Sequence, residues 1–138
     1  MSSKTDGKTL KAKPYVQLWG SGTGRREFLH VDDMADASLF VLNLSQEDYD
    51  ANTEDMLSHI NVGCGTDVSI LELAQMVAGV TGFTGEITTD TSKPDGTMQK
   101  LMDVSRLSAM GWTAKIELES GIEETYRWFL ENISNIRA

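Results

Sequence analysis

The sequence has few of the residues from which disulfides and metal sites are built, and it has no long apolar run. It holds one cysteine, Cys64, and two histidines, His30 and His59. One thiol cannot form an internal disulfide and is typical of a reducing cytoplasm. The two histidines lie at no metal-ligand spacing, so we expect no metal. No apolar run approaches the roughly 20 residues that span a bilayer. We therefore expect a cytoplasmic protein without a membrane partner.

Proline is also scarce, because only two prolines occur in 138 residues, and there is no low-complexity tract. Both features argue against long disordered segments. Hydrophobic residues make up 40% and charged residues 24% of the chain, which is typical of a soluble globular domain. The length suits one domain. Residues 1–13 are polar and lysine-rich, lack the apolar stretch of a secretory signal, and are expected to form a polar tail.

The charge is acidic overall and unevenly placed, with a formal net charge of −9. Residues 1–30 carry six Lys and Arg against two acids, so the excess of negative charge lies in residues 31–138. An acidic surface repels a nucleic-acid backbone, which excludes nucleic acid as a partner. The basic N-terminal part either faces an anion or is only a solvated lysine tail.

Hydrophobic periodicity predicts an α/β chain with a small mixed sheet and packed helices. Strands are expected at 15–19, 27–29, 59–62 and 86–89, and helices at 32–44, 69–82, 103–110 and 118–133. The 69–82 helix is marked most clearly, because Ser69 and Glu72 have the spacing of a capping box and Gly82 is a typical stop. Residues 46–55 are expected to be a polar loop, with one turn of helix as the alternative, and Lys93–Gly96 a type I turn.

The motifs that hold a dinucleotide and its catalytic tyrosine are missing from these 138 residues. Arg25 and Val68 stand where the two Gly-x-Gly sequences would need a third glycine, and there is no Walker A sequence. A short-chain reductase also needs Tyr-x-x-x-Lys, in which the lysine lowers the pKa of the tyrosine. The residues four positions after the three tyrosines are Trp19, Thr53 and Leu130. We therefore expect no catalytic and no cofactor-binding residues here.

One stretch, residues 18–35, carries a specific pattern. It reads LWGSGTGRREFLHVDDMA and resembles the W-G-x-G-x-x-x-R-x-F-x-x-x-x-D-x-A segment of extended short-chain dehydrogenases/reductases that act on nucleotide sugars. Residues 58–63, 92–97 (SKPDGT) and 125–132 agree with a narrower resemblance, to the GDP-L-fucose synthase family. The SKPDGT run discriminates best among these segments.

The resemblance implies a fold, a reaction and a division of the chain. The family is NADPH-dependent, with a Rossmann-like cofactor domain, and converts GDP-4-keto-6-deoxy-D-mannose to GDP-L-fucose by epimerisation at C3 and C5 and reduction at C4. Residues 14–138 would correspond to its C-terminal GDP-sugar-binding domain with remnants of the Rossmann domain. The cofactor-binding half and the catalytic Ser, Tyr and Lys would lie upstream, so this chain alone is expected to be inactive and not to bind NADP(H).

Five residues match substrate-binding positions of the family. The resemblance implies that Arg26 and Lys100 contact the GDP diphosphate, and a guanidinium fork suits phosphate oxygens. It places Asp95 where a carboxylate accepts hydrogen bonds from guanine or ribose, and Ser21 and Trp19 beside the substrate. Each of these residues also has an interpretation that needs no ligand. Arg26 and Lys100 would be solvated cations, and Asp95 and Ser21 would be residues that favour turns. Trp19 would be a strand residue packed in the core.

Neighbouring residues receive simpler interpretations. Arg25 is expected to be solvated, because the matching position belongs to Arg26. The pair Asp32 and Asp33 is explained by the preference of helix N-termini for acids. The methionines 34, 76 and 110 are expected to fill the core.

Three functions remain open from the sequence. The chain is part of a GDP-L-fucose synthase, or a non-catalytic GDP-sugar-binding module, or a non-functional gene fragment. The first requires association with a cofactor-binding half, and a homodimer is also compatible with the sequence. In each case the apolar faces of the 32–44 helix and the 59–62 strand would lack the domain that normally covers them, which favours self-association.

Overall fold

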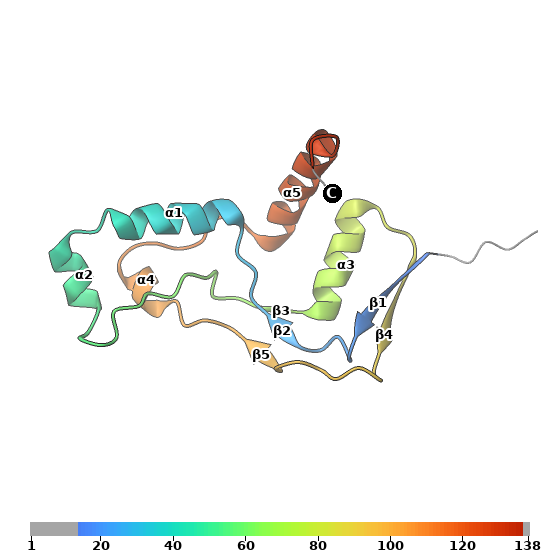
Figure 1. Ribbon diagram of the computed structural model, residues 1–138, viewed down its shortest axis with the longest axis horizontal. Helices are drawn as coiled ribbons and strands as arrows, with labels where there is room; N and C mark the ends of the chain where they lie inside the picture. The colour runs from blue at the N-terminus through green and yellow to red at the C-terminus, as the bar shows by residue number, and fades with distance from the viewer. Residues whose placement is uncertain (1–13, 137–138) are drawn as a thin grey trace, which may run out of the picture.

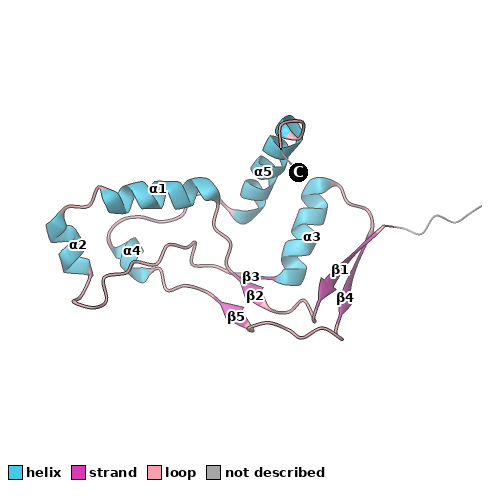
Figure 2. Ribbon diagram, in the orientation of Figure 1, coloured by secondary structure: helices cyan, strands magenta, loops and turns pink. Residues whose placement is uncertain are grey.

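The computed structural model describes residues 14–136, and the expected tail at residues 1–13 lies outside that range. The described chain is elongated, with a pair of long strands at one end and a short helix at the other (Figure 1). It contains five strands and five helices, connected by long irregular segments (Figure 2). The α/β class is confirmed, although the strands form two small sheets rather than one.

The first sheet is a parallel pair, and the second is a mixed sheet of very short strands. The strands are β1 (Tyr15–Trp19), β2 (Arg25–Arg26), β3 (Val68–Ser69), β4 (Glu86–Asp90) and β5 (Gln99–Lys100). Strand β1 pairs with β4 along its whole length. The second sheet has the order β3-β2-β5, in which β2 runs antiparallel to β3 and parallel to β5.

The helices follow the predicted pattern closely. They are α1 (Val31–Leu42), α2 (Gln46–Asn52), α3 (Ile70–Thr81), α4 (Ser105–Ala109) and α5 (Leu118–Asn132). The capping box at the start of α3 is confirmed: Ser69 Oγ accepts from Glu72 N at 3.1 Å, and the Glu72 carboxylate accepts from Ser69 N at 2.7 Å. Gly82, with φ of +69°, ends the helix as predicted. Helices α3 and α5 pack against one another (Figure 1).

Two predicted strands are wrong. The strand at 27–29 forms two residues earlier, as β2, because Arg25 N and Glu27 N donate to the carbonyls of Met98 and Lys100. The segment 59–62 pairs with no strand. Its surroundings are bonded by side chains instead, since Asn61 donates to the Asp103 carbonyl and Arg106 donates to the carbonyls of Leu57 and His59.

Two loop predictions also differ from the structure. The turn expected at Lys93–Gly96 lies earlier, at Asp90–Lys93, where Lys93 N donates to the Asp90 carbonyl at 3.1 Å. Pro94 to Thr97 then continues without a turn into β5. The polar segment after α1 contains α2, whose first turn is capped by Ser45 Oγ accepting from Asp48 N at 3.0 Å. A polar helix of this length lacks the apolar stripe by which helices are recognised in sequence.

The hydrophobic core is small and lies between α1 and α4. Its buried apolar residues in the described range are Ala37, Leu107 and Trp112. Asp33 is buried beside it at 3% exposure, and its carboxylate accepts from Lys115 N at 3.0 Å and Ile116 N at 2.9 Å. Asp33 is therefore a buried link between α1 and the segment before α5, which corrects the interpretation of it as a helix-terminal charge. The expected core position of Met34 is also wrong, since this side chain is exposed.

Large apolar side chains remain uncovered on two helices. On α1 these include Val31 and Leu42, which are 70% and 80% exposed, and on α5 they include Trp128 and Leu130. None of the helices within residues 14–136 is long and apolar enough to cross a bilayer. The described chain thus exposes much of the apolar surface that its helical periodicity predicted to be inside.

Candidate anion-binding site

The five predicted site residues lie on two segments that run side by side. Residues 19–26 connect β1 to β2, and residues 90–100 connect β4 to β5 (Figure 1). Because β1 pairs with β4 and β2 pairs with β5, both ends of the two segments are held together. The structure therefore brings together residues that are more than 70 positions apart in sequence.

A carboxylate joins the two segments at their middle. Asp95 Oδ1 accepts hydrogen bonds from Ser21 N at 2.7 Å and from Ser21 Oγ at 3.0 Å. This oxygen lies so close to Gly20 that a Cβ there would collide with it, and Gly20 also has a φ of +82°. Glycine is thus needed at this position for both space and conformation. Asp95 does more than form a turn, since it fixes the position of the Gly20–Ser21 backbone.

Arg26 and Lys100 form a pair of neighbouring cations. They are direct partners in the β2–β5 register, and partners on adjacent strands project from the same face of a sheet. One guanidinium nitrogen of Arg26 donates to the Arg25 carbonyl at 2.6 Å. Within residues 14–136 neither cation forms an ion pair with a carboxylate. Like charges placed opposite each other are unfavourable, and an anion bound to both would relieve this repulsion.

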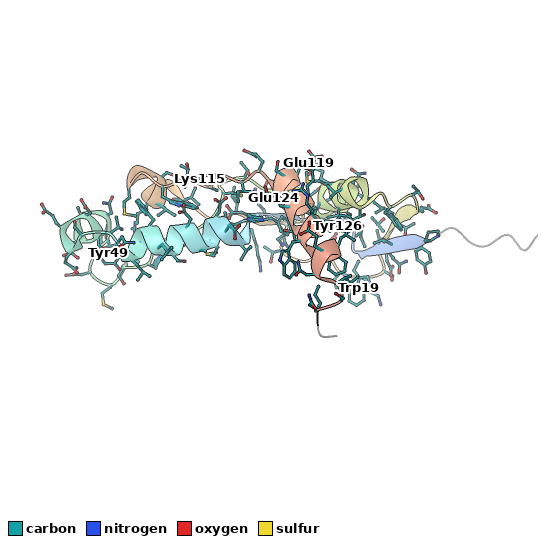
Figure 3. The ribbon with its side chains drawn as sticks, turned by 90° about the horizontal axis from the view of Figure 1, so that it is seen from above. Trp19, Tyr49, Lys115, Glu119, Glu124 and Tyr126 are labelled. Carbon is teal, nitrogen blue, oxygen red and sulfur yellow. The ribbon has the colours of Figure 1, made fainter. Side chains whose placement is uncertain are left out.

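Trp19 lies at the end of β1, and its side chain is open to solvent (Figure 3). At 75% exposure it is not a core residue, so the alternative of a packed strand tryptophan is wrong. The ammonium group of Lys93 lies 5.6 Å from the centroid of its ring, within the range of a cation–π contact. Lys93 thereby places a cation against the ring of Trp19.

The site is open rather than enclosed. Residues 91–100 are exposed throughout. A cavity of about 550 Å³ lies nearby, bordered by Arg26, Phe28, Cys64 and Thr66 on one side and by the start of α5 on the other. Of the five predicted residues, only Arg26 lines this cavity. The described residues thus form an open surface beside this cavity.

Arg25 is bonded to carboxylates, which corrects the expectation that it is solvated. Its Nε donates to Asp67 Oδ1 at 2.7 Å, and a second nitrogen donates to the Asp67 carbonyl at 2.8 Å. Glu72 lies 3.5 Å away on the other side. The hydrogen bond with Asp67 raises the pKa of Arg25. Hydrogen bonds from Gln99 and then from Arg25 hold the pKa of Asp67 below its usual value.

Asp67 and Gln99 were not found by sequence reasoning. The only signal was Arg25 itself, an extra cation beside the matched arginine, whose partner lies 42 residues away. Cys64 takes no part in this network, because its thiol donates to the carbonyls of Phe28 and Thr66. Within the described range, no three His, Cys, Asp or Glu side chains gather as a metal would require.

Comparison with known proteins finds similar sequences and structures. A profile of the NAD dependent epimerase/dehydratase family matches residues 6–63. The GDP-L-fucose synthase of Escherichia coli K12 is 55% identical over 129 residues, which are 94% of this chain and 40% of that protein. Among solved structures, a GDP-6-OMe-4-keto-L-xylo-heptose reductase from Campylobacter jejuni is similar with a TM-score of 0.78 and 43% identity, over 86% of this chain and 34% of that one.

A third similar protein has been solved with NADP bound. The NADP-bound GDP-L-fucose synthetase of Naegleria fowleri is similar with a TM-score of 0.75 and 28% identity, over 90% of this chain and 37% of that one. The chain spans about 40% of the length of the Escherichia coli protein that it matches. In sequence and in fold, the chain is similar to the GDP-L-fucose synthases, and residues 6–63 match the NAD dependent epimerase/dehydratase family.

Proposed function

We propose that this chain supplies the GDP-sugar-binding wall of an NADPH-dependent epimerase and reductase of the GDP-L-fucose synthase type. The observation that carries the proposal is the register of β2 and β5, which sets Arg26 beside Lys100 next to the Ser21–Asp95 link. A diphosphate presents two adjacent negative groups, and this surface presents two adjacent cations. The activity, the substrate GDP-4-keto-6-deoxy-D-mannose and the product GDP-L-fucose are proposed from the relatives' names and the matched residues.

Each residue has a defined role in this proposal. The guanidinium of Arg26 offers planar, paired donors to phosphate oxygens, and Lys100 adds a point charge. Hydrogen bonds to charged groups contribute about 1.5–3 kcal/mol each. Asp95 uses only Oδ1 for Ser21, so Oδ2 remains to accept a hydrogen bond from guanine or ribose. The exposed indole of Trp19 provides an apolar surface for the substrate.

The helix N-termini within residues 14–136 do not suit binding of the NADP pyrophosphate. A dinucleotide pyrophosphate binds at a helix N-terminus that follows a Gly-rich turn. The first turn of α3 is capped by its own Ser69 and carries Glu72, while α1 begins with Asp32 and Asp33. Helix α5 has Glu117 at its N-cap position. Glu119 lies in its first turn (Figure 3). These acids oppose an anion, so we propose that the cofactor and the proton-transferring tyrosine are held by a separate folded unit.

The exposed apolar surface supports docking of such a unit. The accessible surface is 10650 Å², whereas a compact monomer of 15.2 kDa exposes about 7,100 Å². Even if all residues outside 14–136 were fully accessible, the described part would expose about 1,700 Å² more than a compact chain of its length. A standard interface buries about 800 Å² on each partner. The excess is therefore sufficient for an interface of standard size with a cofactor-binding unit, supplied in the same or another polypeptide.

A second candidate function is a non-catalytic GDP-sugar-binding module. The observation in its favour is that both segments of the anion-binding site, 19–26 and 90–100, lie within this chain. The two functions differ in whether the bound sugar is turned over once a cofactor-binding unit is present.

A chimera separates them. Residues 14–138 replace the matching segment of the Escherichia coli GDP-L-fucose synthase, and oxidation of NADPH with GDP-4-keto-6-deoxy-D-mannose is followed by absorbance. The proposal predicts a turnover that is lost in the Arg26→Ala chimera and retained in an Arg127→Ala control on α5. A chimera that folds and binds NADPH and GDP but does not turn over would favour the binding module.

A further inference from the structure

One carboxylate beside β3 accepts hydrogen bonds from both other strands of the second sheet. Asp67, which directly precedes β3, is almost fully buried, with a side-chain exposure of 8%. Its Oδ1 accepts from Arg25 on β2 at 2.7 Å, and its Oδ2 accepts from the side-chain amide of Gln99 on β5. The three strands of this sheet are thereby connected through the two oxygens of a single side chain.

The backbone alone gives these strands little register specificity. Strands β2 and β5 are two residues long, and Arg25 N and Glu27 N donate to Met98 O at 2.8 Å and Lys100 O at 3.3 Å. A slip of one residue would turn every side chain of a strand to the opposite face. It would place Lys100 on the face that Gln99 now occupies and break the pairing of Lys100 with Arg26.

The side chains of the sheet alternate between two faces. Arg25 and Gln99 are register partners and both reach Asp67, so they share one face. Arg26 and Lys100, the next residues on each strand, share the opposite face. Asp67 and Glu72 also compensate the charge of Arg25, which leaves Arg26 and Lys100 as the uncompensated cations of this sheet.

We propose that Asp67, held between Arg25 and Gln99, is a positioning residue that fixes the register of β2 and β5 and so keeps Arg26 and Lys100 on one face. The part of this inference that concerns a ligand rests on the proposed function, because it takes the cation pair to be the diphosphate site. The part that concerns register does not depend on any ligand.

The test compares Asp67→Ala with wild type in two measurements. The first is the NOE pattern between β2 and β5 in the ¹⁵N-labelled chain, which reports the register without ligand. The second is the dissociation constant for GDP by calorimetry. We expect Asp67→Ala to lose the cross-strand NOEs between residues 26 and 100 and to bind GDP about tenfold more weakly, a loss of 1.4 kcal/mol. Retention of the wild-type NOEs and affinity in a folded variant would overturn the proposal.

Two further variants keep the test decisive. Asp36→Ala removes a different carboxylate link, to Lys115 and Trp112, and should leave both the NOEs and the GDP affinity unchanged. If Asp67→Ala does not fold, Gln99→Ala removes one partner of Asp67 at an exposed position and should weaken the same NOEs. Unchanged NOEs in Gln99→Ala would then overturn the register role.

The outcomes distinguish the two proposals. If wild type does not bind GDP, or if Arg26→Ala binds it as well as wild type, the proposed function fails, whereas the NOEs still decide the register role. If Arg26→Ala abolishes binding while Asp67→Ala changes neither NOEs nor affinity, the proposed function stands and the positioning role fails.

Discussion

Arg25 and Arg26 are adjacent in sequence and opposite in environment. Arg25 is bonded to Asp67 and lies near Glu72, while Arg26 donates only to a backbone carbonyl within the described range. Strand geometry is the cause, because successive side chains point to opposite faces. A charge that is already compensated adds little to anion binding. The available charge at this site therefore comes from Arg26 together with Lys100.

Replacement of Arg26 by alanine tests this assignment. We expect Arg26→Ala to raise the dissociation constant for GDP about tenfold or more, since one lost hydrogen bond to a charged group corresponds to about 1.5–3 kcal/mol. The control is Arg127→Ala, which removes an exposed charge on α5. Calorimetric titration of both variants gives the comparison, and equal affinities would remove Arg26 from the site.

Asp33 connects α1 to the segment before α5. Its buried carboxylate accepts from two backbone amides, Lys115 N and Ile116 N. Asp33→Ala leaves these donors without their partner, so we expect the free energy of unfolding to fall by about 1–3 kcal/mol. Asp32→Ala, at the exposed neighbouring position, should change it far less. Urea denaturation of both variants decides the point, and equal midpoints would contradict the role given to Asp33.

At the scale of elements, a second carboxylate links α1 to the segment before α5. Asp36 accepts from Lys115 Nζ at 2.9 Å and from Trp112 Nε1 at 3.0 Å, and Figure 3 shows Lys115 beside α1. The hydrogen bond from Lys115, followed by that from Trp112, lowers the pKa of Asp36. A carboxyl whose pKa is lower when folded stabilises the protein above its unfolded pKa, and that contribution is lost as the pH falls through the folded pKa.

Because the pKa of Asp36 is lower in the folded state, its contribution to stability should depend on pH. Wild type should be more stable than Asp36→Asn at neutral pH, and the difference should shrink as the pH falls below about 4. This stability difference is measured from the urea denaturation midpoints of both proteins at several pH values between neutral and acidic. A difference that stays constant over this range would show that the ionised form of Asp36 is not what stabilises the contact.

The elements predicted correctly are those with a strong local pattern. Strand β1 and helices α1, α3 and α5 have clear periodicity or caps, and the structure confirms them. Strands β2 and β5 are set by pairing between distant segments, which no local pattern shows. Residues 59–62 have the composition of a strand but no partner. Composition alone therefore predicted one strand too many and placed another two residues too late.

The candidate site was predictable only in part. Its residues were found through the family resemblance, and the structure adds that 19–26 and 90–100 lie side by side. The link between Ser21 and Asp95 spans 74 positions, and the one between Asp67 and Gln99 spans 32. Contacts of this kind depend on tertiary packing, so a single sequence does not show them.

At the scale of the whole molecule, the uncovered apolar surface dominates the behaviour expected in solution. Within residues 14–136, three buried apolar side chains form the core, while Val31, Leu42 and Trp128 remain more than half exposed. Contiguous exposed apolar surface favours association.

We therefore expect the isolated chain to self-associate, and its unfolding midpoint to rise with protein concentration. Light scattering and thermal unfolding at several concentrations measure both. Trp128→Gln, which removes one exposed aromatic side chain from α5, should reduce the association. A monomer with a sharp, concentration-independent transition would contradict this expectation.

The most direct test of the central claim is calorimetric titration of the purified chain with GDP, with UDP as the control for the base. The account predicts that GDP binds, that UDP binds more weakly, and that Arg26→Ala removes most of the GDP signal. Absence of GDP binding at millimolar concentration, or binding that Arg26→Ala leaves unchanged, would contradict the claim that this chain carries a GDP-sugar-binding surface.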